Sequence, residues 1–312
     1  MGLEYNAIKF LLWAKNLGVS FNQTATLGRQ GFTCKRSTLT SAFRNFGIPA
    51  TEEDVDRCVW REPLAAPQAD AFLKFLGANE LVTVDRSAFE GATLIHDLND
   101  PFPASLRGSF DLVIDGGTLE HIFDYPRALT HCLELLRVGG HFITFTPTSG
   151  QMGHGFYQFS PELFFRVFSA ERGFALRKMI LFECSKMDSN FYEVEDPAKK
   201  GGRSPSPIRP MQLAVLAQKI DDHPKVTDPP QQSDYVAIWK QAEEVKSQGD
   251  SGARPPGFIP RLRTALNPYW PRWMHEWKHI FLHYWKWQRG LAAQKTLRHF
   301  RRIPKDEIFR QR

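Results

Sequence analysis

Short apolar runs that end in polar or glycine-bearing turns dominate the first two thirds of the chain. Three of them lie at residues 93–96, 110–114 and 141–146. Uninterrupted apolar runs of this length are typical of parallel strands whose two faces are both covered by helices. Four more runs predict further strands, at residues 24–27, 81–84, 174–184 and 212–218. The pattern therefore predicts an α/β domain.

Helix signals lie between and after these runs. Residues 1–16 and 69–76 are expected to be helical, and the second segment ends at Gly77, since glycine tolerates the left-handed backbone that terminates helices. A third helix begins at Ser160, because a hydroxyl cap, a proline and an early carboxylate follow one another there. The segment at about 33–67 is irregular but compatible with helix, and we interpret it as an insertion.

Composition divides the chain into three parts. Residues 1–220 are expected to form the α/β domain, and residues 221–260 a linker with one short amphipathic helix at about 235–245. Two segments rich in proline, glycine and polar residues flank that helix. Residues 261–312 are expected to form a basic, tryptophan-rich helical tail.

The tail carries apolar residues at alternating spacings of four and three, which predicts one continuous apolar helical face: Trp273, Trp277, Ile280, Tyr284, Trp287 and Leu291. From Arg254 onward, 14 Lys and Arg stand against 3 Asp and Glu, a balance of +11, whereas the rest of the chain carries −5 of the net +6. This composition is typical of a helix at a membrane interface and indicates an anionic partner. Docking of the same face onto the protein's own core or onto a partner protein is the alternative.

The remaining composition indicates one sizeable core with an appendage, in a chain of 312 residues of which 42% are hydrophobic. No apolar run approaches the roughly 20 residues that a membrane-spanning helix needs. The first residues carry Glu4 and lack a basic leader, so they are interpreted as a helix rather than a signal peptide. Four scattered cysteines predict reduced thiols and a cytoplasmic protein, peripheral at the membrane if the tail binds lipid: Cys34, Cys58, Cys132 and Cys184.

We expect no bound metal. The tail holds a row of histidines spaced by four residues, His275, His279 and His283, but no cysteine or suitable acid lies near them in the sequence. Glu120 and His121 are expected to orient their own turn rather than to perform chemistry.

A series of motifs follows the strand order. FDLVIDGG occupies residues 110–117, LEH residues 119–121 and LLRVGG residues 135–140, directly before the next strand. In this order and spacing, over roughly residues 20–220, the chain resembles class I S-adenosylmethionine-dependent methyltransferases. The resemblance implies a Rossmann-like, seven-stranded, mostly parallel sheet with helices on both faces, and S-adenosyl-L-methionine as the cofactor. GHGFYQFSPE, at residues 153–162, is similar to members associated with surface polysaccharide modification.

The candidate cofactor residues stand at the carboxyl ends of the strands, where ligands bind in such sheets. Asp85 is expected to accept hydrogen bonds from both ribose hydroxyls, since a carboxylate with two acceptor oxygens matches a cis-diol. The resemblance implies that Asp97 and Leu98 meet the adenine edge, and that Asp115 and Gly116 line the methionine part. The structural alternatives are turn-capping roles for the first two aspartates and a tight turn for the glycine.

The first glycine loop departs from the family pattern. After its first strand the family has an acidic residue and alternating glycines, which let the backbone approach the cofactor. Here Gly28 is in place, but Thr26 replaces the acid and Gln30 stands at the second glycine. Arg29 is a candidate cofactor-binding residue that is expected to compensate for this departure by pairing with a carboxylate, or else to point to solvent. A catalytically inactive binding or scaffold protein is therefore the alternative function.

The acceptor side is expected within residues 153–162. His154 has the pKa range of a general base, and the aromatic residues at 156, 157 and 159 would wall a substrate pocket. Tyr157 is a second candidate, for a hydrogen bond to the acceptor, and a structural loop histidine is the alternative for His154.

The expected reaction is O-methylation of a glycan or another small hydroxylated acceptor. A nicotinamide-dependent oxidoreductase is disfavoured because Pro161 stands four residues after Tyr157, where such an enzyme would need a lysine. Nucleic acid is not favoured as a partner, since no recognised nucleic-acid motif accompanies the basic tail.

Overall fold

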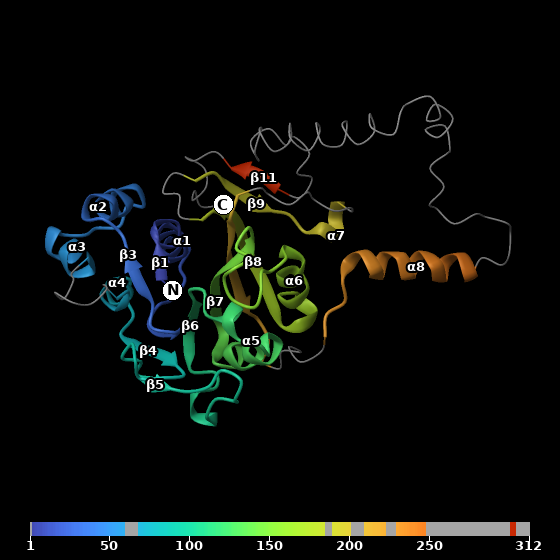
Figure 1. Ribbon diagram of the computed structural model, residues 1–312, viewed down its shortest axis with the longest axis horizontal. Helices are drawn as coiled ribbons and strands as arrows, with labels where there is room; N and C mark the ends of the chain where they lie inside the picture. Colours follow the sequence, from blue (N-terminus) through green and yellow to red (C-terminus); the bar gives the residue numbers. More distant parts are fainter. Residues whose placement is uncertain are drawn as a thin grey trace.

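The structure of the chain is a computed structural model that describes residues 2–59, 68–184, 189–200, 209–222, 229–247 and 300–303. Within these residues, one sheet of nine strands forms the centre of the protein (Figure 1). From one edge to the other, its strands are β11 (Phe300–Ile303), β9 (Phe191–Val194), β8 (Phe174–Glu183), β10 (Met211–Lys219), β7 (Leu136–Ser149), β6 (Phe110–Asp115), β2 (Gln23–Leu27), β4 (Glu80–Asp85) and β5 (Leu94–Ile95).

The described sheet therefore has nine strands rather than the seven expected. All seven expected strands are present and occupy consecutive places, from β8 to β5. The two additional strands, β9 and β11, extend the sheet beyond β8 as antiparallel neighbours. Each of them has only four residues, too few to form an apolar run that predicts a strand. The two arginines of β11 suit a strand at an exposed edge of the sheet. The four residues of β11 belong to the segment that was expected to be helical.

The expectation of a mostly parallel sheet holds for one half only. β2 pairs in parallel with β4 and with β6, β4 pairs in parallel with β5, and β6 with β7. In the other half, β10 runs antiparallel to both of its neighbours, β7 and β8. The sheet is thus mixed, and its parallel half contains the candidate site.

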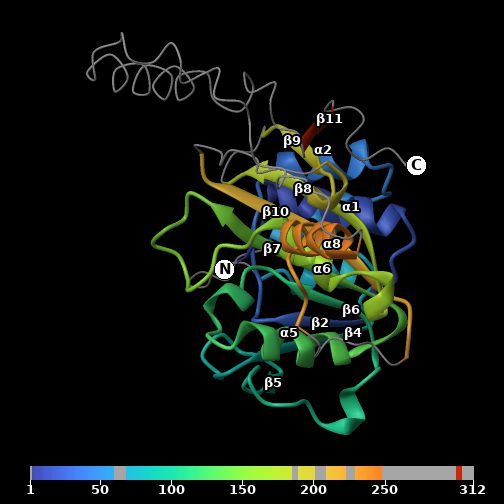
Figure 2. The ribbon, with the colours of Figure 1, turned by 90° about the vertical axis from the view of Figure 1, so that its right-hand side faces the viewer.

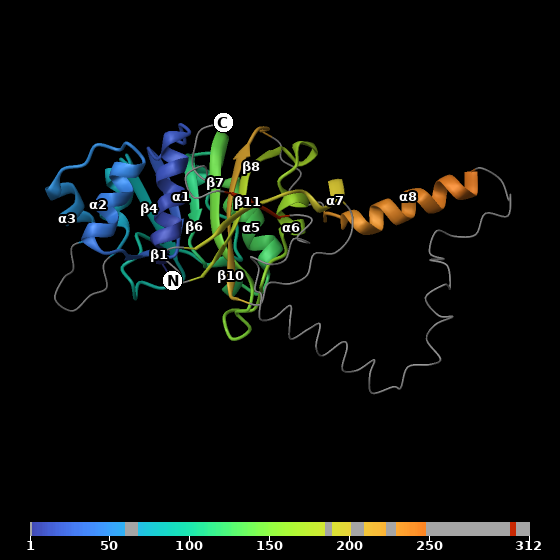
Figure 3. The same ribbon diagram turned by 90° about the horizontal axis from the view of Figure 1, so that it is seen from above.

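Helices cover both faces of the sheet (Figures 1 and 3). One face carries α1 (Tyr5–Asn16), α2 (Arg36–Asn45), α3 (Glu52–Val59) and α4 (Asp70–Phe75), and the other carries α5 (Tyr125–Glu134) and α6 (Pro161–Val167). Because successive strand residues point to opposite faces, neighbouring residues enter different cores. Ile114 belongs to the first core and Val113 to the second. Figure 2, seen from the side of α5 and α6, shows these helices in front of the sheet.

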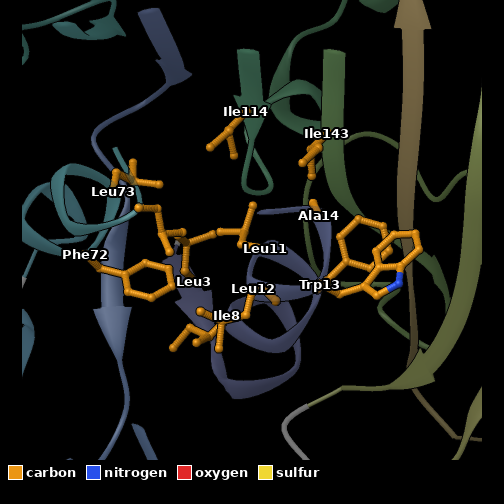
Figure 4. Packing of buried hydrophobic residues seen from close by; sticks show 14 of the residues in the cluster. Leu3, Ile8, Leu11, Leu12, Trp13, Ala14, Phe72, Leu73, Ile114 and Ile143 are labelled. Atoms are coloured by element: carbon orange, nitrogen blue, oxygen red, sulfur yellow. The ribbon is translucent and has the colours of Figure 1, made fainter. Parts of the chain in front are cut away.

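The N-terminal helix α1 is almost completely enclosed. Figure 4 shows Leu11 and Leu12 of this helix between side chains of α4 and of the sheet. Directly before it, β1 (Gly2–Glu4) pairs in parallel with β3 (Gly31–Thr33). A Cβ at position 2 would lie 2.7 Å from the carbonyl oxygen of Gly31, so the close approach of these strands requires glycine. The start of the chain is thereby fixed to the segment that follows β2.

Two helix signals of the sequence are confirmed, whereas the helix expected over residues 1–16 begins only at Tyr5, because Gly2–Glu4 form β1. α4 ends just before Gly77, which has φ +103°, and the hydroxyl of Ser160 caps α6 by accepting from the amide of Glu162 at 3.3 Å. α2 and α3 lie within the expected insertion. α8 (Ser233–Ser247) corresponds to the helix expected at about 235–245, and a single turn, α7 (Pro197–Lys200), precedes β10.

Among the described helices, none is both long enough and apolar enough to cross a membrane. The four cysteines are free thiols. The expected tail helix lies outside the described residues up to position 299, together with its aromatic face and with the row His275, His279 and His283.

Candidate functional site

The order of the strands reverses beside β2. From β2 the chain proceeds outward through β4 to β5, and it then returns to β6 on the other side of β2 and continues to β7. In sheets of this kind, ligands bind outside the carboxyl ends of the strands at such a switch point. The register places Leu27 beside both Val84 and Asp115, so the ends of β2, β4 and β6 share one edge.

The side chain of Gln30 fills the space between the ends of β2 and β6. Its amide nitrogen donates to the carbonyl of Leu27 at 2.5 Å, and its Oε1 lies only 2.0 Å from where a Cβ at position 116 would stand. This contact requires the glycine that is present at that position. The residue is 2% exposed, and its Oε1 accepts no hydrogen bond from the described residues. Gln30 therefore presents a buried, unsatisfied acceptor at the switch point.

Gly28 makes the turn out of β2. Its φ of +74° is in the left-handed region that favours glycine, and its amide donates to the carbonyl of Val84 at 2.6 Å. A Cβ here would lie 3.0 Å from the hydroxyl of Thr118, which itself donates to the carbonyl of Leu27 at 2.6 Å. The turn after β2 is thereby fastened to the turn after β6.

Arg29 is held by the chain itself. Its guanidinium forms an ion pair with Asp70 of α4 at 2.9 Å and donates to the carbonyl of Glu90 at 3.0 Å. Arg29 is therefore paired within the protein rather than pointing to solvent, and its expected part in cofactor binding stays a prediction. These contacts connect the loop after β2 to α4 and to the turn after β4.

Asp85 and Asp97 lie at the adjoining ends of β4 and β5. Asp85 accepts from the amide of Ser87 at 3.0 Å through Oδ1, and its Oδ2 makes no hydrogen bond with the described residues. Asp97 accepts from the backbone and side-chain amides of Asn99 at 3.0 and 2.9 Å, and Arg86 lies 3.6 Å from its other oxygen. The backbone hydrogen bond from Asn99 is the main cause of a lowered pKa for Asp97. Asp97 thus caps its own turn, whereas Asp85 keeps one oxygen available.

Leu98 and Asp115 are both buried. Leu98 is part of the core on the α5 side of the sheet. Asp115 accepts from the amides of Thr118 and Leu119 at 2.8 and 3.3 Å and from the hydroxyl of Thr144 at 2.8 Å. Burial raises the pKa of Asp115, and these hydrogen bonds oppose the shift. Since both of its oxygens are engaged, this turn can meet a ligand through its backbone but not through the aspartate side chain.

On the acceptor side, Glu120, His121 and His154 form a cluster. The loop after β7 reaches the turn after β6, where the amides of Phe156 and Tyr157 donate to the carbonyl of Glu120 at 2.8 and 3.3 Å. Nε2 of His154 lies 3.7 Å from Oε1 of Glu120, and the rings of His121 and His154 stand edge to face with centroids 4.8 Å apart. The side chain of His154 is 47% exposed, whereas that of Glu120 is buried.

The surroundings of this cluster shift the pKa values of Glu120 and His121. Burial, and secondly the charge of Asp115, raise the pKa of Glu120 to about 8. Burial, and secondly the neighbouring His154, lower the pKa of His121. Both shifts favour the neutral forms of the two side chains, because charged groups lose hydration when they are buried.

Tyr157 does not present its hydroxyl to the cluster. The hydroxyl donates to the carbonyl of Phe123 at 2.6 Å, and the ring packs against Tyr125 and Phe159. Two exposed aromatic side chains, Phe123 and Phe156, meet edge to face at 5.9 Å and form an apolar rim beside His154. Tyr157 therefore holds the loop to Phe123 through its hydroxyl.

Sequence reasoning found most of this edge but missed two of its features. It did not anticipate that Gln30 covers position 116, nor that Glu120 and His121 meet His154. The sequence did hold a signal for the second feature. Glu120 and His121 follow one strand and His154 follows the next, and the carboxyl ends of neighbouring parallel strands meet at one edge.

No family model matches the sequence, and no curated protein matches it. Solved structures that are similar include the 1,6-didemethyltoxoflavin-N1-methyltransferase of Burkholderia thailandensis with S-adenosylhomocysteine, at 14% identity and a TM-score of 0.36, over 70% of this chain and 78% of that chain. N-methyltransferase NodS from Bradyrhizobium japonicum WM9, also with S-adenosylhomocysteine, is 10% identical with a TM-score of 0.36, over 68% and 86%. The trans-methyltransferase CalH is 13% identical with a TM-score of 0.35, over 69% and 57%. At these identities and TM-scores, the likeness assigns no activity or substrate to this chain.

Proposed function

We propose that the protein is an S-adenosyl-L-methionine-dependent methyltransferase whose site is the edge formed by the carboxyl ends of β2, β4 and β6. One observation carries the proposal: at the switch point of the strand order, Asp85 has an available carboxylate oxygen one strand away from the buried, unsatisfied oxygen of Gln30. The motif order between residues 110 and 147 supports the same conclusion.

Three groups of the chain fit three parts of the cofactor. The Asp85 carboxylate would accept from the ribose diol through its available Oδ2 and through the second lone pair of Oδ1, which already accepts from Ser87. Oε1 of Gln30 would accept from the ammonium group of the methionine part, which would satisfy an otherwise orphaned buried atom. The backbone of the turn that follows Asp115 would line the same part. When bound, the cofactor supplies a methyl group on a positively charged sulfur.

The proposed acceptor is a small hydroxylated molecule, such as a glycan. The rim of Phe123 and Phe156 offers apolar faces on which such a molecule can lie. His154 is exposed enough to be reached, and its imidazole would take the hydroxyl proton as the methyl group is transferred. Tyr157 would act as a positioning residue, since its hydroxyl holds the loop to Phe123.

Titration calorimetry of the full chain with S-adenosylhomocysteine tests the proposal. We expect binding in the parent protein and weaker binding in Asp85→Ala, by about 5- to 100-fold, since hydrogen bonds to a polar ligand contribute roughly 1 to 3 kcal/mol. Asp100→Asn is the matched control, because Asp100 is an exposed aspartate near the same edge whose charge no part of the site requires.

A binding or scaffold protein without methyl transfer is the second candidate, and the side chain of Gln30, which fills the space beside Gly116 at the switch point, favours it. The titration separates the two functions. If the parent protein does not bind S-adenosylhomocysteine at millimolar concentration, the methyltransferase proposal fails. If Asp85→Ala binds as well as the parent, Asp85 does not hold the ribose.

A further inference from the structure

Three potential metal ligands meet where the turn after β6 and the loop after β7 touch. One ligand atom from each of Glu120, His121 and His154 lies within 4.8 Å of the other two. The first two residues belong to the short turn Leu119–His121, and the third to the loop that follows β7. Backbone hydrogen bonds from Phe156 and Tyr157 to Glu120 hold the loop on the turn, so the cluster is fixed by more than its own side chains.

Two of these side chains carry buried atoms that nothing satisfies. Oε2 of Glu120 and Nε2 of His121 are buried and make no hydrogen bond with the described residues. The side chain of Glu120 is 2% exposed, which places it among the most enclosed polar groups of the described chain. Buried polar groups are otherwise hydrogen-bonded, so both atoms point to a partner that the chain does not supply.

The local charge points the same way. Asp115 and Glu120 are both buried, and within the described residues neither carboxyl group forms an ion pair with a lysine or an arginine. Buried charges in proteins are paired or coordinate metals. A cation at the cluster would compensate this concentration of acidic groups.

We propose that Glu120, His121 and His154 bind one divalent transition-metal ion, with zinc as the best match. Imidazole nitrogens and a carboxylate oxygen suit zinc, and three protein ligands leave a fourth position open to water or to another ligand. The site differs from the histidine row of the tail in having a buried acid as one of its ligands.

The three ligand atoms lie within 4.8 Å of one another and must draw together to bind one ion. A tetrahedral ion with bonds of about 2.1 Å holds its ligand atoms about 3.4 Å apart. Nε2 of His154 and Oε1 of Glu120 are already 3.7 Å apart. Gly153 and Gly155 flank His154. No atom lies within 4 Å of a Cβ built at position 153, whereas a Cβ at position 155 would stand 2.9 Å from the carbonyl oxygen of Glu120, so the loop is open before His154 and packed against Glu120 after it.

Metal binding does not depend on methyl transfer. One consequence does rest on the proposed function. If His154 binds the ion, it is no longer free to take the proton of the acceptor hydroxyl, and the ion would instead lower the pKa of that hydroxyl. The two proposals are therefore tested with different ligands, zinc for this site and S-adenosylhomocysteine for the cofactor site.

The test is calorimetric titration of the chelator-treated full chain with Zn²⁺, together with the visible absorption of the Co²⁺ form. We expect the parent protein to bind one zinc ion per chain. Its zinc affinity should fall at least about 100-fold in Glu120→Gln and in His154→Gln, since loss of an outer-shell partner alone costs about 10- to 100-fold in affinity. The control His279→Asn changes the tail row and should keep this zinc ion. Zinc should also raise the melting temperature of the parent but not of the two site variants.

Equal zinc affinity in the parent and in both site variants would overturn the proposal. Loss of zinc binding in His279→Asn alone would overturn it too. Absence of zinc binding by the parent would overturn it as well. Melting curves recorded without metal show whether each variant is folded. If zinc binds through Glu120 and His154 while S-adenosylhomocysteine does not bind, the metal site stands and the methyltransferase proposal fails.

Discussion

The side chain of Gln30 decides how much room the switch point offers a ligand. It donates to the carbonyl of Leu27 and covers Gly116, so it is a structural bridge next to the turn that is proposed to line the methionine part. Thr118 also donates to the carbonyl of Leu27, which means that this oxygen keeps a partner if the amide is removed. Gln30 is therefore open to substitution without leaving a buried carbonyl unsatisfied.

We expect Gln30→Met to weaken S-adenosylhomocysteine binding about tenfold, because methionine has a similar length but lacks the acceptor proposed for the ammonium group. Calorimetry measures the affinity, and the melting temperature shows whether the fold is retained. Gln158→Met is the matched control, since Gln158 is an exposed glutamine whose oxygen accepts only from the amide of Gln151. Tighter binding in Gln30→Met would mean that the amide obstructs the crevice rather than serving the ligand.

The sequence predicts the place of a site residue when that place follows directly from the end of a strand. Asp85 follows an apolar run, and its place at a carboxyl end follows from that run alone. The meeting of His154 with Glu120 depends on how the loop after β7 folds back, which no local pattern encodes. The same holds for Gln30, whose contact with position 116 joins two turns that lie far apart in the sequence.

At the scale of elements, α6 terminates the loop that carries His154. Its first turn is fixed by Ser160, and Phe164 inserts from it into the core between α6 and the sheet. This helix was predictable because its start signal is entirely local. The strands β1, β3, β9 and β11 were not, since each has three or four residues and exists only because a distant partner pairs with it.

We expect Ser160→Ala to destabilise the fold by about 1 kcal/mol, because the amide of Glu162 loses its capping acceptor. In a chain of this size, that corresponds to a fall in melting temperature of about 2 to 4 °C. Ser160→Asp retains an acceptor at the cap and should melt close to the parent. If Ser160→Ala melted at the same temperature as the parent, the cap would contribute nothing to α6.

At the scale of the whole molecule, the last described strand returns the chain to the sheet. β11 pairs with β9 through four register positions from Phe300 to Ile303, and Arg301 forms an ion pair with Glu193. In the sequence, the basic, tryptophan-rich segment is therefore followed directly by a strand that pairs with the domain. Removal of everything after Gly257 would delete β11 together with this segment, so it would change stability as well as any binding by the tail.

We expect the intact chain to sediment with vesicles that contain anionic lipid, because each lysine or arginine near such a surface contributes about 1 kcal/mol and the residues from Arg254 onward carry a balance of +11. Salt at about 1 M should weaken the association, since it shortens the screening length to about 3 Å. A chain in which Trp273, Trp277 and Trp287 are replaced by serine keeps β11 and every basic residue, and should lose the apolar part of the binding.

A variant that sediments as well as the parent would show that the aromatic face does not enter the bilayer. If the parent ignores vesicles while the serine variant melts at a lower temperature, the aromatic face packs against the protein, and the membrane hypothesis fails.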